Sequence, residues 1–141
     1  MTGEAAIVSH PRMRRGITKI LRGLLWLMAA GIVVQVFLAG LFNFGDPDAR
    51  DTHESVGWMV HTVGMVALLL AIAGPRTRIA VLGTLGLVVL NTVQILLSNA
   101  DTSGVAALHP TLGLAVLATV LVLAVRIGHE ERPEPELTDA R

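Results

Sequence analysis

Four long stretches of the chain lack Asp, Glu, Lys and Arg and are almost continuously apolar. Each is about 20 residues long, enough for a helix that rises about 1.5 Å per residue to cross a hydrocarbon core of roughly 30 Å. Because apolar positions do not alternate with polar ones, the pattern favours helices over the strands of a membrane barrel. The predicted spans are 23–42, 55–74, 79–98 and 105–125.

Short connections join the first span to the second and the third to the fourth, so these neighbours are expected to run antiparallel. The sequence therefore predicts an all-α, integral membrane four-helix bundle over residues 17–127. A cytoplasmic tail is expected at 1–16. The charged, proline-broken stretch at 128–141 is expected to be a disordered cytoplasmic tail.

The composition is 52% hydrophobic, which is too apolar for a typical soluble domain. The chain has no cysteine, which excludes disulfides, thiolate metal ligands, thioether-attached haem and iron–sulfur clusters. Membrane lipid is the expected surrounding, and no nucleic acid partner is expected.

Charge is divided unevenly between the connections, although the net charge is zero. Basic residues gather before the first span, between the second and third, and after the fourth, whereas loops 43–54 and 99–104 hold mainly acidic residues. The positive-inside rule then predicts that both termini are cytoplasmic and both loops face outward. We expect a multi-pass protein of a bacterial cytoplasmic membrane. The basic residues on the inner side are Arg12, Arg14, Arg15, Lys19, Arg22, Arg76, Arg78 and Arg126.

A polar pattern occurs twice within the apolar region. Gln35 in the first span is followed by His53, which opens "HESVG", and Gln94 in the third span is followed by His109, which opens "HPTLG". This order predicts two repeated helical hairpins related by an axis along the membrane normal. The repeat would place His53 and His109 at equal depth, facing one another from diagonal helices near the outer face.

Two facing imidazoles are a suitable axial pair for haem iron, so His53 and His109 are the predicted ligands of a b-type haem. Gly57 and Gly113 follow the histidines at a spacing of four residues, on the same helix faces. A glycine at this position would let a flat ring approach the backbone. Glycines also promote close packing of membrane helices, which is the alternative interpretation.

Other polar side chains have more than one interpretation. Gln35 and Gln94 are candidate contacts to the cofactor, and with Asn91 they are also typical of side chains that hydrogen-bond between membrane helices. His61 lies eight residues after His53, about 12 Å deeper along a helix. It is the alternative iron ligand, or a hydrogen-bonding residue, or a contact to a quinone.

At these motifs the chain resembles a family of small four-span bacterial membrane proteins known only as a domain of unknown function. The shared features are a glutamine with "LAG" in the first span, H-x-x-x-G in the second and "LHP" in the fourth. The resemblance covers residues 17–126.

The chain also resembles, more faintly, one half of haem A synthase, where a four-helix bundle holds haem between histidines of its second and fourth helices. This resemblance implies His53 and His109 as the haem ligands. The catalytic half of haem A synthase has a glutamate four residues before its second-helix histidine, whereas this chain has Ala49 there. This difference argues against haem oxidation as the function of this chain, but it is compatible with a role in binding haem.

The expected function is therefore bis-histidine binding of haem b near the outer face, for one-electron transfer or haem-linked redox, in an electron carrier rather than an enzyme. The expected partner is a quinol, an outward-side carrier or another membrane redox subunit, and a homo-oligomer stays open. One alternative is a haem-free accessory or scaffold subunit. Another is a small transporter or transition-metal site using His53, His61, His109 and Asp51, because imidazole also suits zinc and copper.

Overall fold

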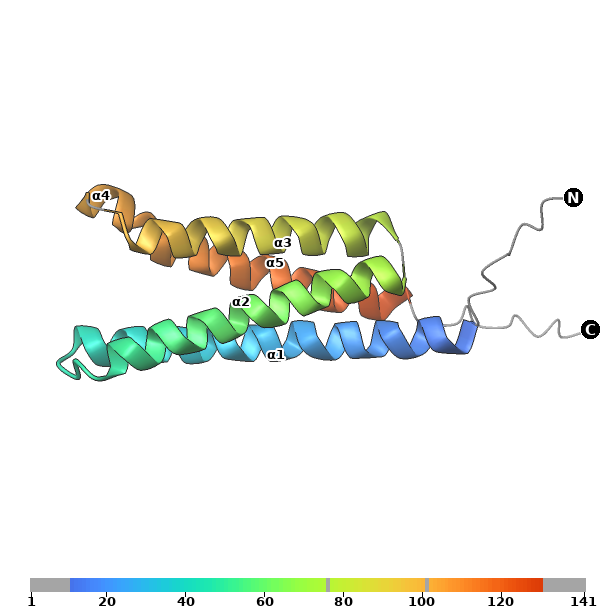
Figure 1. The fold of residues 1–141 in the computed structure, drawn as a ribbon, viewed down its shortest axis with the longest axis horizontal. Coiled ribbons are helices and arrows are strands. Elements are labelled where there is room, and N and C mark those ends of the chain that lie inside the picture. Colours follow the sequence, from blue (N-terminus) through green and yellow to red (C-terminus); the bar gives the residue numbers. More distant parts are fainter. Residues whose placement is uncertain (1–10, 76, 101, 131–141) are drawn as a thin grey trace, which may run out of the picture.

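The computed structural model describes residues 11–75, 77–100 and 102–130, and in these residues every regular element is a helix. Four of the helices are long and apolar enough to cross a membrane. The predicted all-α, integral membrane four-helix bundle is therefore confirmed (Figure 1). The elements are α1 (Pro11–Asn43), α2 (Ala49–Ala73), α3 (Arg78–Ser98), the short α4 (Ser103–Ala106) and α5 (Leu108–Glu130).

The helices differ in extent from the apolar runs. α1 begins at Pro11, so the part of the expected tail from residue 11 to 16 is helical, and proline is a favoured first helical residue. α3 begins where the Thr77 side chain accepts a hydrogen bond from the amide of Ala80 at 3.1 Å. α5 continues to Glu130, so the start of the expected C-terminal tail is helical too. The remainder of both expected tails, 1–10 and 131–141, lies outside the described residues.

The four long helices form two antiparallel pairs, α1 with α2 and α3 with α5. α1 also packs on α5, and α2 on α3. The order around the bundle is therefore α1, α2, α3, α5, with α2 and α5 at diagonal corners. We call the end with the α1–α2 connection and α4 the hairpin end, and the end where α1 begins and α5 ends the terminal end (Figure 1).

The packed core occupies the middle and the terminal end of the bundle. Its largest fully buried side chains include Leu21, Leu25, Met28 and Leu87. Towards the hairpin end, the part of the core that all four long helices share finishes with one residue from each. These four are Ile32, Val60, Asn91 and Val116, with exposed fractions of 6%, 7%, 2% and 1%. Nearer the hairpin end than these four, only Leu38 and Ala49 of the α1–α2 hairpin are buried among the described residues. Beyond this level the two hairpins diverge (Figure 1).

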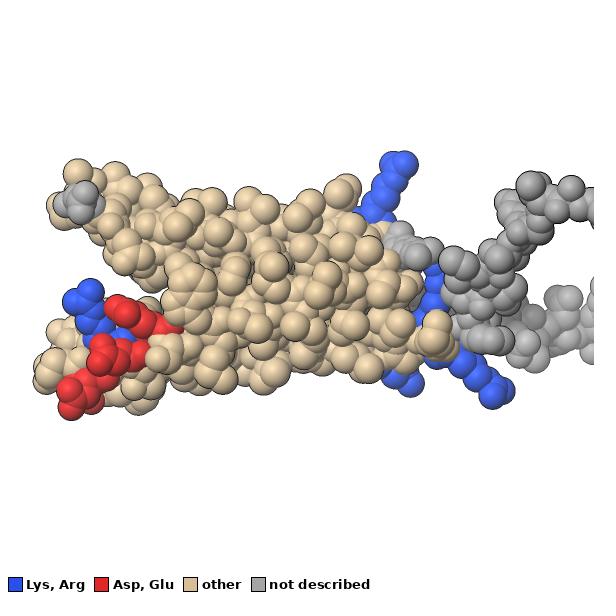
Figure 2. Space-filling model, in the orientation of Figure 1, with Lys and Arg blue, Asp and Glu red and all other residues tan. Residues whose placement is uncertain are grey.

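The outer surface of the helices is apolar, with large side chains such as Phe37, Leu82 and Val122 exposed. Such a surface suits contact with lipid chains. Described charges lie at the two ends: basic residues at the terminal end, and acidic residues with one basic residue at the hairpin end (Figure 2).

Candidate cofactor-binding site

A cavity of about 810 Å³ opens between the two hairpins at the hairpin end. Ile32, Val60, Asn91 and Val116, the last core residues of the four helices, all line it and form its floor. Its volume lies within the range of about 300–1,000 Å³ that is usual for small-molecule and cofactor sites. Because every long helix contributes to the lining, a ligand here would contact both hairpins.

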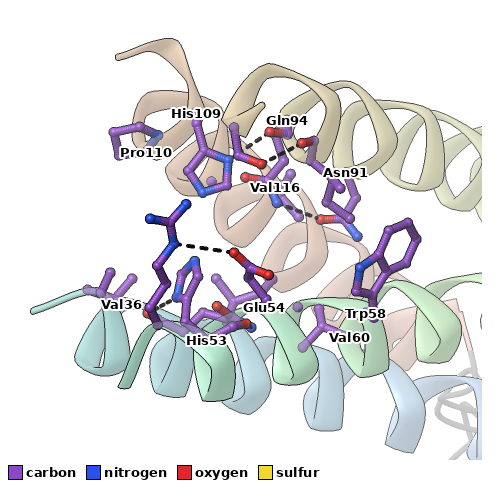
Figure 3. A pocket seen from close by; sticks show the side chains of 18 of the residues that line it. Val36, His53, Glu54, Trp58, Val60, Asn91, Gln94, His109, Pro110 and Val116 are labelled. Carbon is purple, nitrogen blue, oxygen red and sulfur yellow. Dashed lines mark hydrogen bonds and ion pairs between the residues drawn. The ribbon is translucent and has the colours of Figure 1, made fainter. Parts of the chain in front are cut away.

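His53 on α2 and His109 on α5 project into this cavity towards one another (Figure 3). Their ring centroids lie 6.2 Å apart, and the ring planes make an angle of 69°. Each histidine lies seven residues from the floor residue of its own helix, Val60 or Val116, which corresponds to a height of about 10 Å. The structure therefore brings together the two histidines that the sequence singled out, on diagonal helices and at matching height.

Each of the two imidazoles is held by the same kind of hydrogen bond, from Nδ1 to the backbone oxygen of a glutamine. Nδ1 of His53 lies 3.1 Å from the backbone oxygen of Gln35, and Nδ1 of His109 lies 2.7 Å from that of Gln94. A carbonyl oxygen only accepts, so Nδ1 of each ring must carry the proton and donate it. The neutral ring then has its lone pair on Nε2. Imidazoles that ligate metals are commonly held in this way, through the ring nitrogen that does not touch the metal.

The spacing of the rings suits a shared metal ion. Two imidazoles that ligate one ion at about 2.0–2.1 Å through opposed Nε2 atoms have their centroids about 6 Å apart. Within the described residues, no group of three or more His, Cys, Asp or Glu is placed to hold a metal. The two histidines thus suit an ion whose other ligands come with it, which is the case for the iron of a porphyrin.

Each glutamine side chain lies against the glycine that follows the histidine in the adjacent helix. A Cβ atom on Gly57 would lie 3.2 Å from Gln35 Nε2, and one on Gly113 would lie 3.8 Å from Gln94 Oε1. Gln35 Nε2 also donates to the carbonyl of His53 at 2.7 Å. Both glycines line the cavity. The close approach at Gly57 shows that a glycine there makes room for the Gln35 side chain, whereas the distance at Gly113 is an ordinary van der Waals contact. The predicted contact of both glycines with a flat ring stays a prediction.

His61 belongs to a separate polar chain on the α2–α3 side. Gln94 Nε2 donates to Asn91 Oδ1 at 3.2 Å, and Asn91 Nδ2 lies 3.2 Å from His61 Nδ1. This amide orientation makes His61 Nδ1 an acceptor and leaves the proton on Nε2. The His61 ring also meets Trp58 edge-on, with centroids 5.9 Å apart. His61 is therefore held in the opposite tautomer to the cavity histidines and does not line the cavity.

Sequence reasoning missed three residues that line the cavity on the side of His53. Phe42 meets the His53 ring edge-on, with centroids 5.6 Å apart. Arg50 and Glu54 line the cavity mouth and pair at 3.4 Å. Their four-residue spacing on one helix could have indicated the pair. Asp51, included in the alternative metal site, does not line the cavity.

Residues 35–102 match the model of a family described as "Family of unknown function (DUF6220)". The match begins at Gln35 and includes His53, Asn91 and Gln94, but it ends before His109. The predicted resemblance to a family of unknown function is thus confirmed over this segment. No curated protein and no solved structure matches the chain, so the resemblance to haem A synthase stays a prediction.

Proposed function

We propose that this protein binds one b-type haem in the cavity between its hairpins, with His53 and His109 as the two axial ligands. The observation that carries the proposal is the pair of opposed imidazoles, 6.2 Å apart, each with Nδ1 bonded to a backbone carbonyl. This bonding leaves a lone pair on each Nε2 for iron.

The cavity also fits the rest of such a ligand. Its floor residues Ile32, Val60 and Val116 are apolar and buried, so they would bury a ring and keep water away from its inner edge. Among the lining residues, polar side chains such as Asn43, Arg50 and Asn99 stand near the ends of the helices. A flat ligand that is apolar inside and polar at one edge matches this division.

The residues of the chain would mainly hold the haem and orient its two ligating imidazoles. The carbonyls of Gln35 and Gln94 fix the two imidazoles, and hydrogen bonding at Nδ1 raises the basicity of the ligating nitrogen. Because the carbonyls belong to helices, they shift little when a ligand enters. When bound, haem would supply reversible one-electron transfer.

We further infer a bacterial inner-membrane protein with both termini in the cytoplasm and the hairpin end outside. The support is the gathering of Lys and Arg at the terminal end, to which the positive-inside rule applies. A site near one surface cannot carry electrons through the whole bilayer. The partner would then be a quinol, a carrier on the outer side, or another membrane subunit.

An absorption spectrum of the purified protein, oxidised and then reduced, tests the proposal. We expect a Soret band that shifts on reduction, sharp visible bands, and one haem per chain after titration with ferric protoporphyrin IX. Colourless protein that also fails to take up added haem would contradict the proposal. In that case stoichiometric zinc or copper would support the transition-metal alternative, and no ligand at all would support a scaffold subunit.

A further inference from the structure

The mouth of the cavity carries one basic side chain, Arg50, and one acidic side chain, Glu54, among its lining residues. Arg50 Nε lies 3.4 Å from Glu54 Oε1, and the two side chains are 72% and 62% exposed. An ion pair this exposed is weak, because water screens it and both side chains lose freedom in forming it. It can therefore open when a stronger partner for either side chain arrives.

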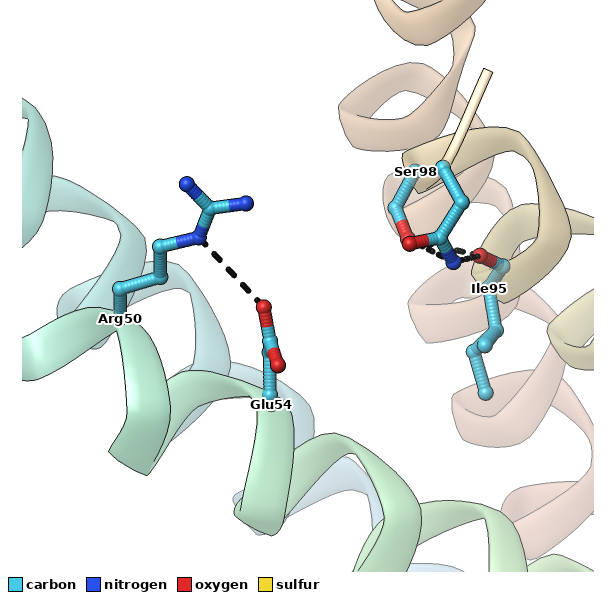
Figure 4. Close-up of polar contacts among 5 residues, drawn as sticks. Arg50, Glu54, Ile95 and Ser98 are labelled. Atoms are coloured by element: carbon cyan, nitrogen blue, oxygen red, sulfur yellow. Dashed lines mark hydrogen bonds and ion pairs between the residues drawn. The ribbon is translucent and has the colours of Figure 1, made fainter. Parts of the chain in front are cut away.

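Arg50 is placed to meet a ligand held by the histidines. It precedes His53 by three residues on α2, so it lies on a neighbouring face about one turn nearer the hairpin end. From α2 it extends into the space that faces Ser98 at the end of α3 (Figure 4). Ser98 and Asn99 line the cavity from that opposite wall.

The guanidinium keeps donors to spare. Only its Nε is bonded to Glu54, and its terminal nitrogens have no partner among the described residues. Arginine presents several N–H donors in a planar fork that matches both oxygens of a carboxylate. Arg50 is also the only Lys or Arg between Arg22 and Arg76, and there is none between Arg78 and Arg126, so no other Lys or Arg competes for an anion at this end.

We propose that Arg50 binds a carboxylate of the cavity ligand and that Glu54 competes with that carboxylate for the same guanidinium. The ligand is then an amphipathic acid, with its apolar part against the floor and its acid group at the mouth. This inference rests on the proposed haem-binding function, because the propionate groups of haem b are such acids. It adds that these acids, and not only the iron, decide which ligand the cavity selects.

Two ligands that differ only in their acid groups test this inference. Ferric protoporphyrin IX and its dimethyl ester are titrated into purified full-length protein in detergent, and the dissociation constants are read from the Soret band. We expect the free acid to bind about tenfold more tightly, since hydrogen bonds to charged groups are worth about that much. Arg50→Gln should remove this preference by weakening binding of the free acid alone. Glu54→Gln should strengthen binding of the free acid, because the competing carboxylate is gone.

Arg126→Gln is the matched control, because it removes the same charge near the terminal end, far from the cavity. It should bind both ligands as the unaltered protein does. Equal binding of acid and ester by the unaltered protein would overturn the inference while leaving the haem proposal intact. Equal weakening of both ligands by Arg50→Gln would likewise overturn it, by giving Arg50 only a structural role. If neither ligand binds, both proposals fail.

Discussion

His53, His61 and His109 lie in or next to the predicted spans. Their Nδ1 atoms have different hydrogen-bond partners. Nδ1 of His53 and His109 faces a carbonyl oxygen, whereas Nδ1 of His61 faces the amide group of Asn91. A carbonyl requires a protonated Nδ1, and an amide N–H requires an unprotonated one. One residue type therefore appears in two tautomers within a single helix, α2. Only the first tautomer offers Nε2 to a metal in the neutral state.

Asn91 is the residue whose loss tests the polar chain that links α3 to α2. Asn91→Leu would remove the partner shared by Gln94 and His61, a loss worth about 1 kcal/mol for hydrogen bonds between membrane helices. We expect a lower midpoint of thermal unfolding in detergent. Thr92→Val is the control, because the Thr92 hydroxyl bonds only the carbonyl of Val88 in its own helix. If the Asn91→Leu midpoint equals that of the control, Asn91 is not a packing contact.

At the scale of the elements, each hairpin carries the same arrangement of histidine, glutamine carbonyl and glycine. The order of these residues along the chain predicted that the two histidines would face one another at equal depth. It did not predict their contacts with the glutamine carbonyls, because these contacts depend on how α1 and α3 are rotated about their axes. Core and lipid-facing residues are equally apolar, so the sequence of a membrane helix hides its rotation. The common origin of the two hairpins as a repeat stays a prediction.

Substitutions at the glycines test the hairpin arrangement. Gly57→Leu and Gly113→Leu should each weaken haem binding roughly tenfold or more, because an added side chain overpacks the place of Gln35 or Gln94. With alanine instead, the effect should be larger at Gly57, where the added atom lies 3.2 Å from glutamine, than at Gly113, where it lies 3.8 Å away. Gly86→Leu is the control, since a Cβ there meets nothing within 4 Å. Full haem loading in both leucine variants would contradict the account.

On the scale of the whole molecule, the four charge-free runs were enough to predict the bundle. They were not enough to predict the cavity, which exists because the core shared by all four helices ends at Ile32, Val60, Asn91 and Val116. Where packing stops depends on side chains from four helices at once, and no single stretch of sequence contains that information. The short helix α4 was also not predicted, because four residues show no periodicity.

The orientation of the whole bundle can be measured with single cysteines, because the chain has none of its own. Cysteines at Asp48 and Ser103, both exposed at the hairpin end, should react with a membrane-impermeant maleimide in intact cells. A cysteine at Lys19, exposed at the terminal end, should react only after the cells are opened. The reverse pattern would overturn the positive-inside assignment.

The most direct test of the central proposal is electron paramagnetic resonance of the haem-loaded protein and three histidine variants. The unaltered protein should give a low-spin, bis-histidine signal. His53→Ala and His109→Ala should each turn the haem high-spin or lose it, because one protein ligand is then missing. His61→Ala should keep the low-spin signal. If His61→Ala abolishes that signal while His53→Ala or His109→Ala retains it, the pairing of His53 with His109 is wrong.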